Sequence, residues 1–118
     1  AGGEATFIQA DVGIGADVKS LVDQTEATYG SLDIMYANAG FTHYVDLEDL
    51  TEDDFEILLN TNFKGFLLCA KYAIPAMKRA GSGSIVFCSS VLNTIGFPQC
   101  VVYSAAKAAM VGAARIVL

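Results

Sequence analysis

Short β-type segments alternate with helical patterns along this chain, and this alternation restricts the possible folds more than any other feature. Each of three expected strands, at 6–10, 32–37 and 84–89, precedes an expected helix, at 17–29, 51–80 and from 103 to the chain end. Parallel strands joined by helices form right-handed crossovers. We therefore predict an α/β fold with a doubly wound parallel sheet and helices on both faces.

The second expected helix has the strongest start and stop signals. Thr51 can cap its N-terminus, and the three acidic residues that follow suit the positive end of the helix dipole. We expect Pro75 to kink it or to start a looser last stretch, and Gly81 to end it. Asp17 is expected to cap the first helix and Gly30 to end it. One amide lies among the residues that recur along its buried face: Phe55, Leu58, Leu59, Asn62, Phe63, Phe66, Leu67, Ala70, Ile74 and Met77.

Composition excludes several classes of function. With 118 residues, 53% of them apolar, the chain fits one globular domain, and its net charge of −6 argues against nucleic-acid binding. It shows no signal-peptide pattern and no apolar run near the roughly 20 residues that a membrane helix needs. Three cysteines without C-x-x-C spacing and the isolated His43 predict reduced thiols, a cytoplasmic protein and no metal site.

A hydroxyl, a phenol and an ammonium are placed to converge beyond the third expected strand. Ser90 directly follows that strand, and ligands of open parallel sheets gather outside the carboxyl ends of the strands. Tyr103 and Lys107 are four residues apart, which puts them on one face of the last helix, one turn apart. Because an ammonium stabilises a nearby phenolate, this pair can act as a general acid and base.

Each candidate residue also has an ordinary structural interpretation. A Tyr and a Lys at helical spacing are commonly a surface pair, and a Ser after a strand is commonly a cap or turn residue. Asp11 and the triplet Asn38-Ala39-Gly40, at the ends of the first two expected strands, are by themselves turn residues. Asn62 lies on an apolar helix face, where a bond to a helix carbonyl would satisfy it.

Taken together, the motifs resemble those of the short-chain dehydrogenase/reductase family. They follow the family's order and cover essentially the whole chain: Asp11-Val12, Asn38-Ala39-Gly40, Asn62-x-x-Gly65, Ser90 and Tyr103-Ser104-Ala105-Ala106-Lys107. One departure is Ala37, where the family commonly has Asn in an Asn-Asn-Ala-Gly sequence. The resemblance implies that the expected sheet is Rossmann-like.

The resemblance also implies the activity, an NAD(P)-dependent oxidoreductase that transfers a hydride between a nicotinamide cofactor and a carbonyl/alcohol pair. Tyr103 would be the general acid/base and Ser90 would hydrogen-bond the reacting oxygen. Lys107 would favour the phenolate and hold the nicotinamide ribose, and Asn62 would hold a water of the proton relay. These four residues form the implied catalytic tetrad.

The same resemblance implies a set of cofactor contacts. Asp11 and Val12 would meet the adenine, the triplet 38–40 would close the adenosine pocket, and Tyr103 and Lys107 would contact the rest of the cofactor. The uncharged loop 91–102 implies an apolar carbonyl or alcohol substrate, and the helices at 51–80 and from 103 imply a homodimer or homotetramer. The choice between NAD and NADP, and the substrate itself, stay open.

The family's glycine-rich turn, which receives the cofactor pyrophosphate, has no counterpart before residue 6. We therefore interpret residues 1–118 as one partial domain, without that N-terminal strand-turn-helix and without the C-terminal substrate region. The piece alone is expected to bind dinucleotide weakly or not at all, and whether it folds or is active alone stays open. Two alternatives stay open: a binding or scaffold module that lost the cofactor site, and a lyase, epimerase or dehydratase that shares the Tyr-x-x-x-Lys motif.

Overall fold

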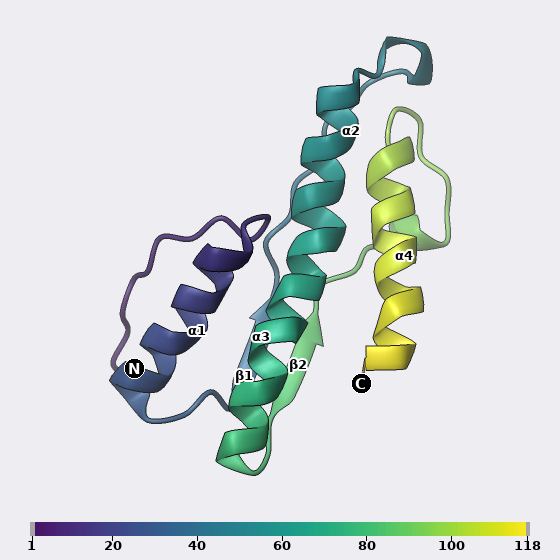
Figure 1. Ribbon diagram of the computed structural model, residues 1–118. Coiled ribbons are helices and arrows are strands. Elements are labelled where there is room, and N and C mark those ends of the chain that lie inside the picture. The colour runs from purple at the N-terminus through teal and green to yellow at the C-terminus, as the bar shows by residue number, and fades with distance from the viewer. Residues whose placement is uncertain (1, 118) are drawn as a thin grey trace.

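A computed structural model of the chain describes residues 2–117 (Figure 1). Two strands and four α-helices form most of it, with two short 3-10 helices and one π-helical segment between them. In chain order the elements are α1 (Gly15–Tyr29), β1 (Ile34–Ala37), η1 (Leu47–Asp49), α2 (Glu52–Leu59), η2 (Asn60–Lys64), α3 (Gly65–Ala80), β2 (Ser84–Phe87), η3 (Val91–Asn93) and α4 (Val101–Val117).

The two strands are parallel neighbours, joined by the long helical crossover between them. Ile34 pairs with Ser84 and Ala37 with Phe87, so both strands end at the same edge of the sheet. Figure 1 shows both arrowheads pointing toward the end of the molecule where α2 and α4 begin. The prediction of an α/β fold with a parallel sheet is confirmed.

One face of this sheet packs against α3, and the other is open. Met35 belongs to the core, and the Phe87 ring meets the Phe66 ring edge-on at 4.1 Å. On the opposite face Ile34, Tyr36 and Val86 are 67%, 59% and 48% exposed. The expectations of a buried 84–89 strand and of helices on both faces are therefore not met within residues 2–117, because no described element covers that face.

The expected strand at 6–10 is also wrong for the described structure. This segment is not part of a sheet, and its Phe7 is 90% exposed. An extended segment becomes a strand only when a neighbour takes its backbone hydrogen bonds, and β1 and β2 pair only with each other in the described part of the chain. The segment runs beside α1 instead, and the Tyr29 hydroxyl donates to Thr6 Oγ1 at 3.0 Å.

Glycine and threonine set the helix ends largely as expected. Gly30 and Gly81 end α1 and α3 with φ of 88° and 89°, a left-handed conformation that glycine adopts without strain. Thr51 caps α2 through a reciprocal pair of bonds with Asp54. The capping role predicted for Asp17 is wrong: α1 begins at Gly15, and the Asp17 carboxylate accepts from the Asp11 backbone amide at 3.0 Å instead.

The helical segment 52–80 is continuous, but its irregularity lies at Asn60–Lys64 rather than at Pro75. These five residues form a π-helical turn between α2 and α3, whereas α3 continues through Pro75 to Ala80. A π-turn adds one residue to the helix and rotates the side chains that it carries. Asn62 lies within this turn, so the turn sets the direction of its side chain.

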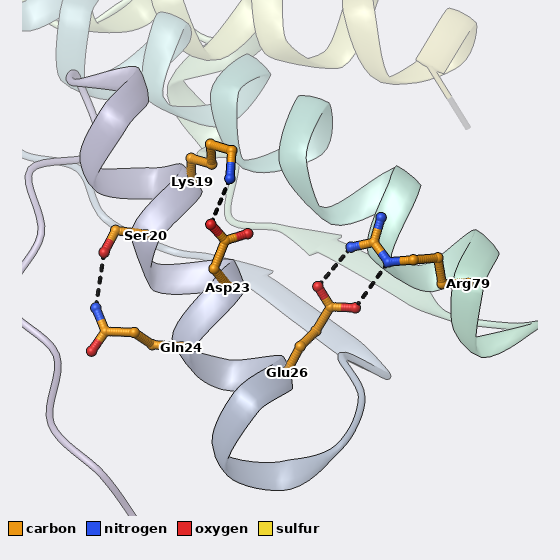
Figure 2. Close-up of polar contacts among 6 residues, drawn as sticks. All are labelled: Lys19, Ser20, Asp23, Gln24, Glu26 and Arg79. Atoms are coloured by element: carbon orange, nitrogen blue, oxygen red, sulfur yellow. Dashed lines mark hydrogen bonds and ion pairs between the residues drawn. The ribbon is translucent and has the colours of Figure 1, made fainter.

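The core lies between α1, α3 and the covered face of the sheet, with Val18, Val22 and Ala73 near its centre. At its margin, Arg79 of α3 makes two bonds, of 2.6 and 3.3 Å, to the Glu26 carboxylate of α1 (Figure 2). An exposed pair of this kind contributes about 0–1 kcal/mol, so α1 is held chiefly by apolar packing.

Two large apolar residues of the helix expected at 51–80, which was expected to contribute to a subunit interface, lie in this chain's own interior. Phe66 is 3% and Met77 is 7% exposed. Within residues 2–117, no helix combines the length and apolar character that crossing a membrane requires. Cys69, Cys88 and Cys100 are free thiols.

Candidate active site

Asn62 is completely buried at the centre of the π-helical turn. Its side-chain nitrogen donates to the Phe41 carbonyl at 2.8 Å and to the Leu58 carbonyl at 3.0 Å. Its Oδ1 accepts no hydrogen bond from the described residues, although buried polar atoms are nearly always paired. The amide is therefore held firmly by its nitrogen, while its oxygen is available to a further donor.

Lys107 of α4 lies beside this amide and is only 3% exposed. Its Nζ donates to the carbonyl oxygen of Cys88 at 2.8 Å, directly after β2. It also lies 5.5 Å from the centre of the Tyr103 ring, one turn earlier on α4. An ammonium has three donors, so Lys107 keeps hydrogen-bonding capacity beyond this one carbonyl.

Gly40 lets these two side chains approach the loop that follows β1. A Cβ atom at this position would lie 2.6 Å from Asn62 Oδ1 and 3.3 Å from Lys107 Nζ. The orphan oxygen and the ammonium therefore approach the same point from α4 and from the π-turn. That point is at the carboxyl end of the sheet, where parallel sheets gather their ligands.

Burial lowers the pKa of Lys107 below its ordinary value of 10.5 because the charged form loses hydration. The Cys88 thiol acts in the opposite direction, since its thiolate form would favour the ammonium. No carboxylate forms an ion pair with Lys107 within residues 2–117. A lysine is rarely buried without a partner charge, and perturbed titratable groups in such places are candidates for function.

Ser90 and Tyr103 lie on adjoining elements. The Ser90 hydroxyl oxygen accepts from the Leu92 amide at 3.2 Å and caps η3, which packs against α4. The turn role considered for this serine is thus present, and its own O–H proton is still free to donate. Tyr103 is half-buried, and within the described residues no hydrogen bond joins it to Ser90. The structure therefore groups Asn62, Lys107 and Tyr103 directly, with Ser90 on the neighbouring turn.

The residues expected to hold the cofactor divide into three groups. Val12, Asn38 and Ala39 line one pocket of about 200 Å³ beside the end of β1. Asp11 lines a different, more polar hollow, and its carboxylate accepts from the Gly13 amide at 2.8 Å, as a turn acid does. Gly40, Tyr103 and Lys107 belong to the cluster described above, so the expected contacts lie in three separate places.

Sequence reasoning missed the Cys88 carbonyl and the π-turn. The carbonyl belongs to the backbone, so only the position of Cys88 after β2 could have indicated it. The π-turn has no composition of its own, although a polar Asn62 on an apolar stripe was a signal that the helix is irregular there.

Replacing Gly40 by alanine should destabilise the protein by about 1–3 kcal/mol, the usual effect of overpacking a well-packed site. The new methyl group would press on Asn62 Oδ1, which its two nitrogen bonds hold in place. Urea unfolding of the variant measures the change. Gly96→Ala is the matched control, because a Cβ there meets nothing within 4 Å. Equal stability of the two variants would contradict the packing described here.

The amino-acid sequence of this chain is similar to those of one family of known proteins. The model of the short chain dehydrogenase family matches residues 1–117. An uncharacterized oxidoreductase of Thermotoga maritima is 44% identical over 97% of this chain and 45% of its own length. A 3-oxoacyl-[acyl-carrier-protein] reductase of Staphylococcus aureus is 35% identical over 94% of the chain and 45% of its own length. The chain thus spans about half the length of the curated relatives it matches.

A solved structure described as a short-chain dehydrogenase/reductase of Burkholderia xenovorans agrees with this. It superimposes with a TM-score of 0.86 at 32% identity and covers 92% of this chain and 41% of the solved chain. The fold, the arrangement of motifs and the family match together show that this chain belongs to the short-chain dehydrogenase/reductase family.

Proposed function

We propose that the protein containing this chain is an NAD(P)-dependent oxidoreductase that interconverts a carbonyl compound and its alcohol, with Tyr103 as the general acid and base. The observation that carries the proposal is the cluster of buried Asn62, buried Lys107 and half-buried Tyr103 at the carboxyl end of the sheet. Relatives described as oxidoreductases or reductases share this part of their sequence.

In carbonyl reduction, the Tyr103 hydroxyl would give its proton to the carbonyl oxygen while the carbon receives a hydride; in alcohol oxidation it would take that proton back. The Ser90 O–H, which the Leu92 contact leaves free, would donate to the same oxygen and hold it in place. The nicotinamide supplies the hydride when bound. One hydride and one proton convert the carbonyl to the alcohol, so the step is balanced.

Lys107 would act on Tyr103 through its charge. Its ammonium, 5.5 Å from the ring centre, stabilises the phenolate left after proton transfer. The unpaired Oδ1 of Asn62 and the spare donors of Lys107 are well placed to share one water molecule, which would return protons to the site. Such a water would give Asn62 Oδ1 the hydrogen bond that it does not receive from the described residues.

We assign the adenosine half of the cofactor to the pocket lined by Val12, Asn38 and Ala39. It is mostly apolar, and it opens beside the strand end that leads to Gly40 and Lys107. Lys107 would hold the nicotinamide ribose with donors that Cys88 does not use. Asp11, which lines a separate hollow, would contribute indirectly, because its carboxylate stabilises the turn that carries Val12.

The direct test is a carbonyl-reduction assay on the full-length protein. NADH and NADPH are each mixed with a panel of ketones, and loss of the reduced cofactor and formation of alcohol are followed together. Turnover that is absent from a Tyr103→Phe sample supports the proposal. If neither cofactor is oxidised in the presence of any ketone, while the folded protein still binds it, the proposal is wrong.

We expect the preferred substrate to be apolar around its carbonyl group. Val91, Ile95 and Phe97 are exposed in the uncharged loop after β2, so a charged substituent there would lose hydration without gaining a partner. A ketone should therefore exceed its carboxylate-bearing analogue in kcat/KM by at least about 10-fold. A phosphorylated or multiply charged compound as the best substrate would contradict this.

We also propose that α2, α3 and α4 contribute to a homodimer or homotetramer. Phe55 and Ile57 of α2 and Val101 of α4 are about half exposed, which leaves apolar side chains on these helices without a cover in the described residues. Sedimentation of the full-length protein at micromolar concentration should give a dimer or a tetramer. A monomer at that concentration would exclude this arrangement.

A further inference from the structure

The loop of residues 41–46, which follows β1 and Gly40, is tied down at both ends. At its start, the Phe41 carbonyl accepts from the buried Asn62 side chain at 2.8 Å. At its end, the Val45 amide donates to the Gln99 carbonyl at 3.1 Å, and the Asp46 carboxylate accepts from the Gln99 side-chain amide at 3.1 Å. The loop thus joins the π-turn to the segment that leads into α4.

Gln99 makes both of these end contacts from a strained backbone. Its φ is 63°, and it is the one non-glycine residue with a positive φ in the described part of the chain. Such a conformation is uncommon for a long side chain and persists only where the surroundings impose it. Here the Val45 and Asp46 contacts hold the carbonyl and the side chain of Gln99 at the same time.

Cys100, the residue after Gln99, directly precedes α4, the helix that carries Tyr103. Cys100 is 1% exposed, its carbonyl accepts from the Ser104 amide at 2.8 Å, and its sulfur lies 3.9 Å from Thr42 Oγ1. A continuous set of contacts therefore runs from Asn62 through the 41–46 loop and Gln99 to the first turn of α4. Figure 1 shows the 41–46 loop and the loop between η3 and α4 at the end of the molecule where α2 and α4 begin.

We propose that Gln99 is a positioning residue. Its left-handed backbone and its amide bond to Asp46 lock the 41–46 loop to the first turn of α4, and this holds the Tyr103 hydroxyl in register with Asn62 and Lys107. The inference rests on the proposed oxidoreductase function. Displacing a reacting group by about 1 Å can lower the rate about 10²-fold. The contacts of Gln99 should therefore affect kcat more than they affect cofactor binding.

Three substitutions of Gln99 separate the backbone from the side chain. Gln99→Asn keeps an amide and a residue that tolerates positive φ, whereas Gln99→Gly keeps the backbone conformation and removes the amide. Gln99→Val removes the amide and strongly disfavours positive φ. We expect the loss of kcat in the full-length enzyme to be smallest for Gln99→Asn, larger for Gln99→Gly and largest, about 10²-fold, for Gln99→Val. The KM for the cofactor should be unchanged in all three variants.

Asp46→Ala deletes the same hydrogen bond from its other side. Its kcat should match that of Gln99→Gly, and this comparison decides the side-chain part of the proposal even if the Val variant does not fold. Wild-type kcat in Gln99→Val, equal losses in all three Gln99 variants, or unequal losses in the Asp46 and Gly variants would each overturn the proposal.

Amide hydrogen exchange tests the lock without any assay of activity. In Gln99→Val, residues 41–46 and the first turn of α4 should exchange faster than in the wild type, and in Gln99→Asn they should not, because the Val45 amide keeps its acceptor. Unchanged exchange in the folded Val variant overturns the proposal. An inactive wild-type protein would overturn the proposed function instead, and the exchange result would still decide whether Gln99 is the lock.

Discussion

Replacing Tyr103 by phenylalanine in the full-length protein should lower kcat for carbonyl reduction by about 10²–10⁴-fold, the usual contribution of a general acid. Cofactor binding should stay close to normal, because the ring remains half-buried beside Lys107 and only one hydroxyl is lost. Steady-state kinetics with both cofactors measures kcat, and fluorescence titration with the reduced cofactor measures binding.

Tyr29→Phe is the matched control for this substitution. It removes the same hydroxyl from α1, where its only described partner is Thr6, and should leave kcat unchanged. Near-normal kcat in Tyr103→Phe would show that Tyr103 is a structural residue on a helix face. Ser90, the next hydroxyl along the site, would then be the residue to test as the proton donor.

Replacing Lys107 by methionine should abolish most turnover, by at least about 10²-fold, while the protein still folds. Methionine fills similar space, so packing against the buried surroundings survives. The substitution removes the positive charge that is proposed to stabilise the Tyr103 phenolate, and the donor that is proposed to hold the cofactor ribose. The KM for the cofactor should therefore rise as kcat falls, unlike the result expected for Tyr103→Phe.

The stability of the same variant has a defined dependence on pH. Burial lowers the pKa of Lys107 in the folded state. Between that lowered pKa and 10.5, the unfolded chain therefore binds more protons than the folded protein does. The wild-type protein should gain stability over that range, and Lys107→Met should lack the gain. Thermal midpoints of the two proteins, measured as the pH is raised, should shift in favour of the wild type. A constant difference between them would contradict a buried, destabilised ammonium.

The sequence was sufficient to predict the class of fold because its signals are local. The Thr51 cap and the glycines at the helix ends depend on near neighbours, and they agree with the structure. The segment 6–10 has an equally good strand pattern, but forming a strand depends on a partner elsewhere. The same holds for the exposure of Val86, since burial of a strand face depends on what covers it.

The sequence was sufficient to predict which residues form the candidate site, but it indicated less of how their atoms are arranged. Tyr103 and Lys107 could be placed together from helical spacing alone, and Asn62 was conspicuous as an amide on an apolar face. The two atoms that complete the cluster, the Cys88 carbonyl and the unpaired Asn62 Oδ1, depend on backbone position and on a π-turn without a sequence signature. The strained Gln99 is equally invisible in the sequence, because a positive φ there arises from contacts with a distant loop.

Isotope transfer from the cofactor to the product alcohol follows the proposed hydride step itself. The full-length protein is supplied with a ketone and a reduced nicotinamide cofactor that carries deuterium at the transferable position, in ordinary water, and the product alcohol is analysed by mass spectrometry. We expect one deuterium on the carbinol carbon, with the hydroxyl proton derived from solvent through Tyr103. An alcohol without deuterium, or a product formed by elimination or epimerisation with no change in the cofactor, would contradict it.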